Sequence, residues 1–377
     1  MNLVRRAFIG RAAGVGLTAA LPASLALNAW AQSPATAAPA ASTPRFAPQA
    51  GDWRSFDVVT RVDLPATTSA TRVWVPLPSV QTDWQTPLDD AFVSNGKARV
   101  VTDGEQGVRM VAAEFPAGTA QPYVEVTSRV RTQSRAQGAR PEREDPSVLR
   151  AALQPTRLIP TDGIVRQTAL KATRGARGDE AKVRAIYDWV VHNAWREPKV
   201  KGCGEGDIKT MLETGNLGGK CADLNALFVG LCRAVGVPAR DVYGIRLAPS
   251  AFGYMQLGSG SANLTGAQHC RSEVYLQAKG WTPMDPADVA KVMRQEKPEW
   301  IKSVSNPLIT PVFQGLYGAW EGNWMAYNTA HDVKLPGSQG DALGFVMYPM
   351  AENADGWFDQ YEPTTFKYKI SASEVKA

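Results

Sequence analysis

The spacing of apolar residues changes once along the chain, and this change constrains the fold more than any other feature. Between residues 53 and 130, apolar side chains such as Phe56, Val58 and Val62 alternate with polar ones, and Pro, Gly and Asn interrupt the runs. Such alternation is typical of short antiparallel strands with one buried face. We therefore expect an antiparallel β-sandwich at residues 52–140.

Helical spacing replaces this alternation after a polar stretch at 131–146, which we interpret as a linker between domains. One helix is predicted to begin at Asp179, whose side chain can cap it. A second is predicted from about Lys220 to Val235, with Gly236 as its stop signal. Cys221 then lies at the N-terminal end of the buried face of this second helix.

Strands are predicted next, at residues 241–247, 272–277 and 281–285. The remainder of the chain is rich in aromatic residues and ends in an alternating run, so we expect it to add more sheet to the same core. These patterns predict an α+β second domain at residues 150–377 with a C-terminal β extension.

The first residues predict export from the cytoplasm. Arg5 and Arg6 form a twin-arginine motif, an apolar stretch follows, and Ala29–Ala31 is a cleavage site, so residues 1–31 are interpreted as a signal peptide. The alternative is an N-terminal membrane anchor, but the stretch is short and contains Pro22. We expect a flexible Ala/Pro-rich leader at 32–51, no stable membrane span after cleavage, and a periplasmic or secreted protein.

The basic character of the chain comes largely from this signal. Residues 1–31 contain three arginines and no acidic residue, so their removal lowers Lys+Arg from 41 to 38 against 36 Asp+Glu, and the net charge from +5 to +2. No basic run remains that would favour nucleic acid or an anionic membrane as a partner.

Three residue types that support covalent acyl transfer follow one another in the second domain: Cys221, His269 and Asp285. A thiolate is the nucleophile, and the positive end of a helix dipole stabilises it by up to about 2 kcal/mol. An imidazole can take and return the proton, and a carboxylate on its far nitrogen fixes the tautomer. Together these groups predict a thiol-dependent enzyme without a cofactor or a catalytic metal.

Strand arithmetic does not by itself select the carboxylate. His269 precedes one strand and Asp285 ends the next, but a tight turn centred at Lys279 sets Asp285 opposite Glu273. A turn nearer Gln277, or a bulge, would close the offset. Glu273 and Asp288 therefore remain alternatives.

The residues around these three groups resemble a known family. Residues 218–223 and 233–240 resemble the core motif of the transglutaminase-like superfamily. His269 and the segment Trp281–Pro286 are similar to its second and third motif blocks, in the same order. The resemblance covers about residues 155–290.

This resemblance implies a papain-like α+β core with Cys221 as nucleophile, His269 as general base and acid, and Asp285 as the residue that orients the imidazole. The predicted sandwich is similar to the domain that often precedes such cores in exported bacterial members. Relatives that crosslink proteins use a tryptophan as oxyanion donor, and Trp195 is the candidate for that role here.

The remaining cysteines have two competing uses. Cys203 and Cys270 are the best candidates for a disulfide, because Cys232 continues the interior of the predicted helix. Cys270 should then point to the opposite face of its strand from His269. A zinc site is the competing use, but its ligands would be scattered and no C-x-x-C pair is present.

We expect acyl transfer from an amide through a Cys221 thioester, with water as acceptor. The substrates would be peptides or proteins, including peptidoglycan stem peptides. One alternative is crosslinking, in which an amine intercepts the thioester. A second is a non-catalytic binding or assembly module of the cell envelope.

Overall fold

The computed structural model describes residues 45–136, 143–362 and 364–375. The predicted signal peptide at 1–31 and the first part of the leader lie outside the described residues. From Thr43 onward the chain clusters into one unit, so the β-sandwich and the helical region belong to the same body.

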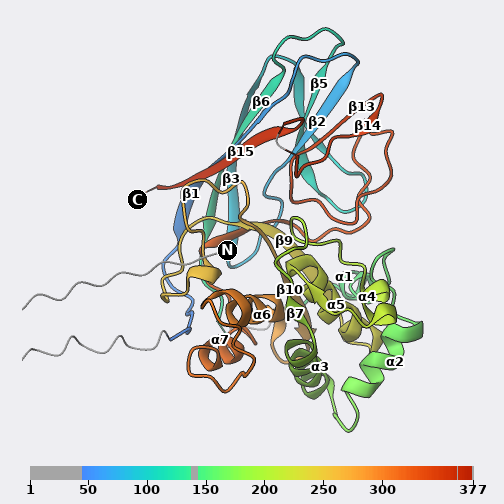
Figure 1. Ribbon diagram of the computed structural model, residues 1–377, viewed down its shortest axis with the longest axis vertical. Helices are drawn as coiled ribbons and strands as arrows, with labels where there is room; N and C mark the ends of the chain where they lie inside the picture. Colours follow the sequence, from blue (N-terminus) through green and yellow to red (C-terminus); the bar gives the residue numbers. More distant parts are fainter. Residues whose placement is uncertain (1–44, 137–142, 363, 376–377) are drawn as a thin grey trace, which may run out of the picture. The chain divides into compact units, whose positions relative to one another are not determined.

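Two antiparallel sheets form the sandwich, and each combines strands from both ends of the chain (Figure 1). The first has the order β15-β1-β6-β3, with β1 at Arg54–Asp63, β3 at Gln85–Ser94, β6 at Tyr123–Thr132 and β15 at Lys367–Val375. The second has the order β14-β13-β2-β5-β4, with β2 at Thr71–Pro76, β4 at Lys97–Thr102, β5 at Arg109–Phe115, β13 at Met350–Asn353 and β14 at Gly356–Trp357.

The alternation of the sequence determines which face of these strands is buried. Phe56, Val58 and Val62 of β1 are all buried, as their shared parity predicts. Val62 packs with Val111 of β5 and other apolar residues of both sheets, which closes the sandwich core.

The C-terminal strands differ from the prediction. We expected the last part of the chain to extend the sheet of the second domain, but Val58 of β1 pairs with Ala372 of β15, and Trp74 of β2 pairs with Met350 of β13. The chain therefore returns to complete the sandwich, because the edges of β1 and β2 need partners as much as the core sheet does. Alternation identifies a strand but not its neighbour.

The second region is built on a four-stranded sheet of order β11-β10-β9-β12. Its strands are β9 at Ala239–Arg246, β10 at Gln268–Leu276, β11 at Gly280–Met284 and β12 at Trp324–Asn328. Two short strands, β7 at Trp195–Arg196 and β8 at Gly218–Gly219, pair in parallel. The predicted strands at 241–247, 272–277 and 281–285 are confirmed within one to four residues at their ends.

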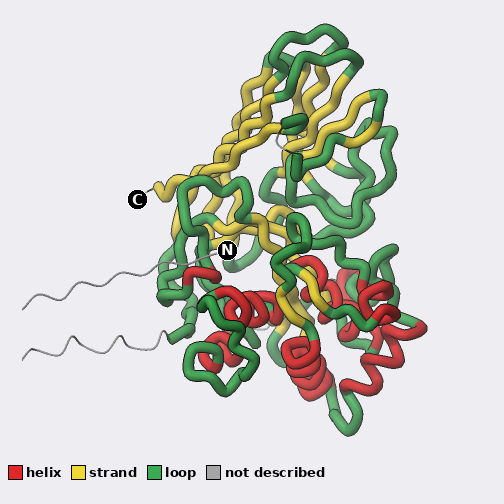
Figure 2. The backbone as a smooth tube through the Cα atoms, in the orientation of Figure 1, coloured by secondary structure: helices red, strands yellow, loops and turns green. Residues whose placement is uncertain are grey.

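Helices accompany this sheet, whereas loops join the strands of the sandwich (Figure 2). They are α1 at Pro146–Ala151, α2 at Gly163–Ala172, α3 at Asp179–Asn193, α4 at Ile208–Thr214, α5 at Cys221–Ala234, η1 at Met255–Leu257, α6 at Pro286–Gln295 and α7 at Thr310–Gly315. The two helices predicted from Asp179 and near Lys220 are confirmed as α3 and α5.

Helix α5 is the centre of this region. It is buried along its whole length and packs against β9 and β10 on one side and α2, α3 and α6 on the others. Apolar residues dominate the helix, and its buried polar side chains Asp223, Asn225 and Arg233 all form hydrogen bonds. The α+β class is therefore confirmed, and Cys221 lies at the first position of the most buried helix.

Two further observations concern the ends of the chain and membranes. Phe46 is buried against the rings of Phe252 and Tyr254, so the last part of the predicted flexible leader is anchored to the second region. In the part of the chain that the structure describes, no helix has the length and apolar character needed to cross a membrane.

Candidate active site

The N-terminus of α5 holds Cys221 in a fixed, buried position. Cys221 is 3% exposed. Asp223 fixes the start of the helix, because its carboxylate accepts hydrogen bonds from the backbone N–H groups of Lys220 at 2.8 Å and Gly206 at 2.9 Å. The first N–H groups of a helix have no acceptor within it, so the positive end of the helix dipole faces the Cys221 sulfur.

The loop before α5 needs glycine for this arrangement. Gly204 has a φ of +88°, and a Cβ there would lie 1.8 Å from a carboxylate oxygen of Asp223. The absence of a side chain allows the loop that carries Cys203 to reach Asp223. The Ala222 N–H donates to the Cys203 carbonyl at 2.9 Å, which ties this loop to the helix.

His269 and Asp285 come from neighbouring strands of the core sheet. His269 is the second residue of β10, and Asp285 directly follows β11 and caps α6 by accepting from the Asp288 N–H at 3.0 Å. Leu276 pairs with Gly280 and Ser272 with Met284, so the turn is centred on Ala278. Asp285 is thus two positions from the residue opposite His269, and the side chains meet along the diagonal without a bulge.

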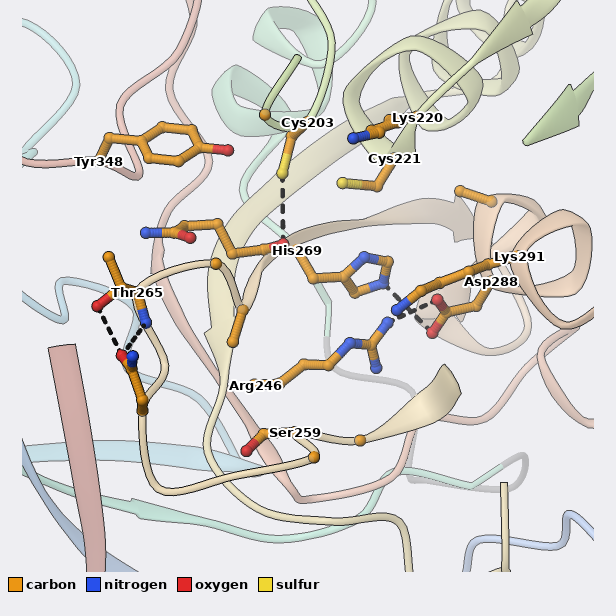
Figure 3. A pocket seen from close by; sticks show the side chains of 18 of the residues that line it. Cys203, Lys220, Cys221, Arg246, Ser259, Thr265, His269, Asp288, Lys291 and Tyr348 are labelled. Atoms are coloured by element: carbon orange, nitrogen blue, oxygen red, sulfur yellow. Dashed lines mark hydrogen bonds and ion pairs between the residues drawn. The ribbon is translucent and has the colours of Figure 1, made fainter. Parts of the chain in front are cut away.

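The His269 ring contacts two carboxylates. Its Nε2 lies 2.8 Å from Oδ2 of Asp285 and 3.3 Å from Oδ2 of Asp288. Asp288 also accepts from Arg246 at 2.6 Å through its other oxygen. Figure 3 shows the ring between Cys221 on one side and Asp288 on the other.

Asp285 and Asp288 are both fully enclosed, but their electrostatic surroundings differ. Burial and the nearby Asp288 raise the pKa of Asp285, despite His269 and Arg271. Burial also opposes ionisation of Asp288, but the Arg246 guanidinium and His269 outweigh it and hold the pKa of Asp288 well below its usual range. Asp288, a weaker candidate from the sequence, is therefore the more firmly ionised of the two.

The pKa values of the Cys221 thiol and the His269 imidazole are shifted in opposite directions. Burial alone would raise the pKa of Cys221, but hydrogen bonds from Cys203, Cys270 and His269 hold it well below its ordinary value. Burial and Arg246 lower the pKa of His269, yet Asp288 and Asp285 overcome them and raise it to about 9. These shifts favour a thiolate beside an imidazolium at neutral pH.

The predicted disulfide is not formed. Cys203 and Cys270 are both free, and both lie close enough to Cys221 to lower the pKa of its thiol. The sequence predicts that Cys270 points away from His269. His269 is among the described residues that line the cavity and Cys270 is not, but the Cys270 side chain lies beside Cys221 at the start of α5. The thiol of Cys203 donates to the Gln268 carbonyl at 3.3 Å.

Supporting contacts come from residues that the sequence did not single out. The indole N–H of Trp324 donates to the His269 carbonyl at 2.9 Å, and that of Trp320 donates to the Met284 carbonyl at 3.2 Å. These bonds hold the backbone on both sides of the His269–Asp285 pair. Tryptophans in an aromatic-rich tail carry no sequence signal for this role.

Polar side chains complete this support. Asn225, one turn after Cys221 on α5, donates to the Cys270 carbonyl at 2.8 Å and lies 3.4 Å from Oδ1 of Asp285. The Arg271 guanidinium lies 3.7 Å from Oδ2 of Asp285 and packs 4.7 Å above the Trp324 ring. Asp285 is therefore held by groups from α5, β10 and α6.

A cavity of about 430 Å³ opens onto Cys221 and His269 (Figure 3). Polar and charged side chains dominate its lining, and Ser259 and Thr265 contribute from the loop before β10. Tyr348, Tyr361 and Tyr368 of the C-terminal segment also line it. The returning chain that completes the sandwich therefore also supplies part of the wall of the site.

Two sequence candidates lie elsewhere. Trp195 is not among the described residues that line the cavity, and its indole nitrogen lies against Gly218, three residues before Cys221. Glu273 is buried between Arg135 and Arg240, with which it forms ion pairs, so it is not the partner of His269.

The same groups have the spacing of a metal site. His269, Asp285 and Asp288 each place one ligand atom within 4.8 Å of the others. Arg246 and Arg271, however, already bring positive charge to these carboxylates. We therefore interpret the cluster as a hydrogen-bonded network around the imidazole.

Comparison with known proteins agrees with this arrangement. Residues 166–286 match the family model of the Transglutaminase-like superfamily, a range that contains Cys221, His269 and Asp285. An uncharacterized protein of Haemophilus influenzae is 35% identical over 324 residues, which cover 81% of this chain and 86% of that protein.

Solved structures are more distant. A candidate cysteine protease from Cytophaga hutchinsonii is similar at 17% identity and a TM-score of 0.49, over 86% of this chain and 99% of its own. The periplasmic domain of TgpA from Pseudomonas aeruginosa is similar at 17% identity and a TM-score of 0.33, over 62% of this chain and 91% of its own. These likenesses are too weak to bear on function, but the sequence matches do define the family. The chain belongs to the transglutaminase-like superfamily.

Proposed function

We propose that the protein catalyses acyl transfer from amides through a thioester on Cys221, and that water is the usual acceptor. The observation that carries this proposal is the buried chain of contacts from Cys221 through His269 to Asp285. On one side His269 lowers the pKa of the Cys221 thiol, and on the other its Nε2 lies 2.8 Å from the Asp285 carboxylate.

In the first half of the reaction, the Cys221 thiolate attacks the amide carbonyl carbon. The backbone N–H of Cys221 can donate to the oxyanion that forms. The His269 imidazolium then gives its proton to the leaving amine as the C–N bond breaks, which leaves a thioester. Nε2 faces the carboxylates, so Nδ1 is the atom that exchanges this proton.

In the second half, His269 accepts a proton from water as the water oxygen attacks the thioester. The C–S bond breaks, a carboxylic acid product leaves, and the thiolate–imidazolium pair is restored. The polar lining of the cavity supports water as acceptor, because it gives water a path to the thioester.

We also propose that the protein works outside the cytoplasm. The twin-arginine motif at Arg5 and Arg6 and the cleavage site at Ala29–Ala31 support this. Replacing both arginines by lysine should retain the protein in the cytoplasm, which cell fractionation would detect.

The experiment that tests the proposed function is capture of the acyl-enzyme. The mature protein is mixed with a pool of peptides, quenched in acid and analysed by mass spectrometry for an acyl adduct on Cys221. We expect an adduct in the wild type that hydroxylamine removes, and none in Cys221→Ala. Cys232→Ala, on the same helix but outside the site, is the matched control and should retain the adduct.

Added primary amine distinguishes the acceptors. Hydrolysis as the main route predicts free acid products even at millimolar amine, whereas crosslinking predicts amide products in their place. Absence of any adduct in the wild type with the whole pool would contradict the proposed function and favour a binding or assembly role.

A further inference from the structure

The cavity beside Cys221 contains an unusual excess of positive charge. Arg196, Lys220, Arg246 and Lys291 line it. Asp288 is the one carboxylate among the described residues of the lining, and it forms an ion pair with Arg246 at 2.6 Å. Arg196, Lys220 and Lys291 are left without that partner, and we call these three residues the cationic wall.

The cationic wall is polar but not neutralised. The Arg196 guanidinium donates to the side-chain oxygen of Gln295 at 3.1 Å, and the Lys291 ammonium donates to the Gln256 carbonyl at 2.9 Å. Within the described ranges, none of the three forms an ion pair with an acidic side chain. Neutral acceptors hold Arg196 and Lys291 in place without cancelling their charge.

These cations come from elements that also position the reacting groups. Lys220 directly precedes Cys221, and Arg196 lies on β7, which pairs with β8 just before Lys220. Lys291 is one turn after Asp288 on α6. In Figure 3, Lys220 lies near Cys221, and Lys291 lies near Asp288 on the other side of the His269 ring. A ligand beside the nucleophile would therefore meet the cationic wall.

The wall residues are electrostatically unfavourable to one another. Burial and then Arg196 lower the pKa of Lys220, and burial, Arg246 and Arg196 lower that of Lys291 to about 8. Such repulsion costs free energy that a bound anion would relieve. The Cys221 thiolate offsets part of it, as do Asp223 for Lys220 and Asp288 for Lys291, but among the described residues none of these groups forms an ion pair with the cationic wall.

Gln268 adds an independent sign of a missing acceptor. Its side chain lines the cavity and is 7% exposed, yet its amide nitrogen has no hydrogen-bond partner in the described part of the chain. A buried N–H donor without an acceptor is costly, and such groups in native structures commonly face a ligand or water.

We propose that the cationic wall and Gln268 bind a carboxylate of the substrate, so that the preferred acyl donors are peptides with an acidic group close to the amide that is cleaved. This inference rests on the proposed function for the presence of the amide, but the binding of the anion can be measured without turnover. The carboxylate could belong to an acidic side chain or to a free peptide C-terminus.

The test measures binding by calorimetry to the full mature chain carrying Cys221→Ala, in which the thiolate no longer competes for the cations. Three pentapeptides of one sequence are compared: one with a central Glu and an amidated end, its central-Gln isostere, and the Gln peptide with a free C-terminal carboxylate. Arg196→Gln and Lys291→Gln are added separately to the Cys221→Ala chain. Lys171→Gln, an exposed change on α2 outside the cavity, is the matched control.

We expect at least one acidic peptide to bind about tenfold or more tightly than the neutral one, and the stronger acidic peptide to identify the source of the carboxylate. This preference should shrink in Arg196→Gln and Lys291→Gln, persist in Lys171→Gln, and weaken with added salt. Circular dichroism melting checks that each variant is folded. Because the two wall variants are made separately, the test can still be carried out if one of them does not fold.

Equal binding of the three peptides, no binding of any at millimolar concentration, or a preference that both wall variants retain would overturn the inference. If acidic peptides bind selectively but the wild type never forms an acyl adduct with them, the proposed function fails while the anion site stands. If adducts form equally well with acidic and neutral peptides, the proposed function stands and the anion site fails.

Discussion

The segment from Cys221 to Asp288 and the C-terminal segment from Trp320 to Tyr368 contribute to the site in different ways. The first supplies the thiol, the imidazole and both carboxylates, all buried. The second supplies the indole donors that hold their backbone and the tyrosines that line the cavity. The reacting groups thus all come from the first segment, and the second adds supporting contacts only, so substitutions in each should have effects of different size.

The largest effect is expected within the first segment. His269→Ala should lower kcat/KM by about 10³-fold or more, because both proton transfers lose their donor and acceptor. His192→Ala is the matched control, since His192 is exposed on α3 away from the cavity. Peptide turnover measures both. A His269→Ala enzyme within tenfold of the wild type would remove the imidazole from the account.

The two carboxylates should separate activity from stability. Asp285→Asn keeps a side chain that can cap α6 but removes the negative charge beside the His269 imidazole. We therefore expect a fall of about 10²-fold in kcat and little change in melting temperature. Asp288→Asn leaves Arg246 without its buried partner, so we expect a loss of about 3 kcal/mol in the free energy of unfolding and a smaller loss of kcat. The opposite ranking would make Asp288 the orienting residue.

Support from the second segment should be worth less. Trp324→Phe removes the donor to the His269 carbonyl and weakens the ring beneath Arg271, and we expect kcat to fall by about tenfold. Trp300→Phe, at an exposed tryptophan, is the control. Equal activity of the two variants would show that the first segment holds its geometry unaided.

The last prediction concerns stability alone. Asp241 of β9 is buried, neither carboxylate oxygen has a hydrogen-bond partner within the described residues, and burial raises its pKa to about 7. The folded state therefore holds this proton more tightly than the unfolded state, whose pKa is about 3.9, and stability should fall as the pH rises from about 4 to 7.

Asp241→Asn removes that charge, so its melting temperature should exceed that of the wild type at pH 8 and differ little at pH 4. Asp52→Asn, at an exposed position, should show neither change. Thermal melts across this pH range measure both variants, and an unchanged slope in Asp241→Asn would contradict the assignment.

The same contrast between segments explains what could be predicted from sequence. Helical spacing placed Cys221 at the N-terminus of a buried helix, and family resemblance selected Asp285, which lies 2.8 Å from His269. The turn is centred on Ala278, one residue before the centre considered, which shifts the pairing by two residues and lets the side chains meet diagonally. Local pattern thus identified the residues of the first segment.

Non-local pairing limited the rest. Nothing in the alternation of 367–375 indicates that this strand joins β1, or that Tyr368 faces the cavity. The sequence predicts a bond between Cys203 and Cys270, but both are free, and the packing of the Cys203 loop and β10 around the start of α5 places both thiols beside Cys221. Such contacts depend on which elements lie together in space, which spacing along one segment does not specify.

The central claim, a Cys221 thiolate paired with the His269 imidazolium, is tested most directly by the rate of alkylation of Cys221 against pH, followed by mass spectrometry. The low pKa of Cys221 and the pKa of about 9 for His269 predict a rate that is nearly constant from pH 5 to 8 and loses this plateau in His269→Ala. An ordinary thiol, with a pKa of about 8.5, would react almost 10³-fold faster at pH 8 than at pH 5. That steep rise in the wild type, or a plateau unchanged in His269→Ala, would contradict the account.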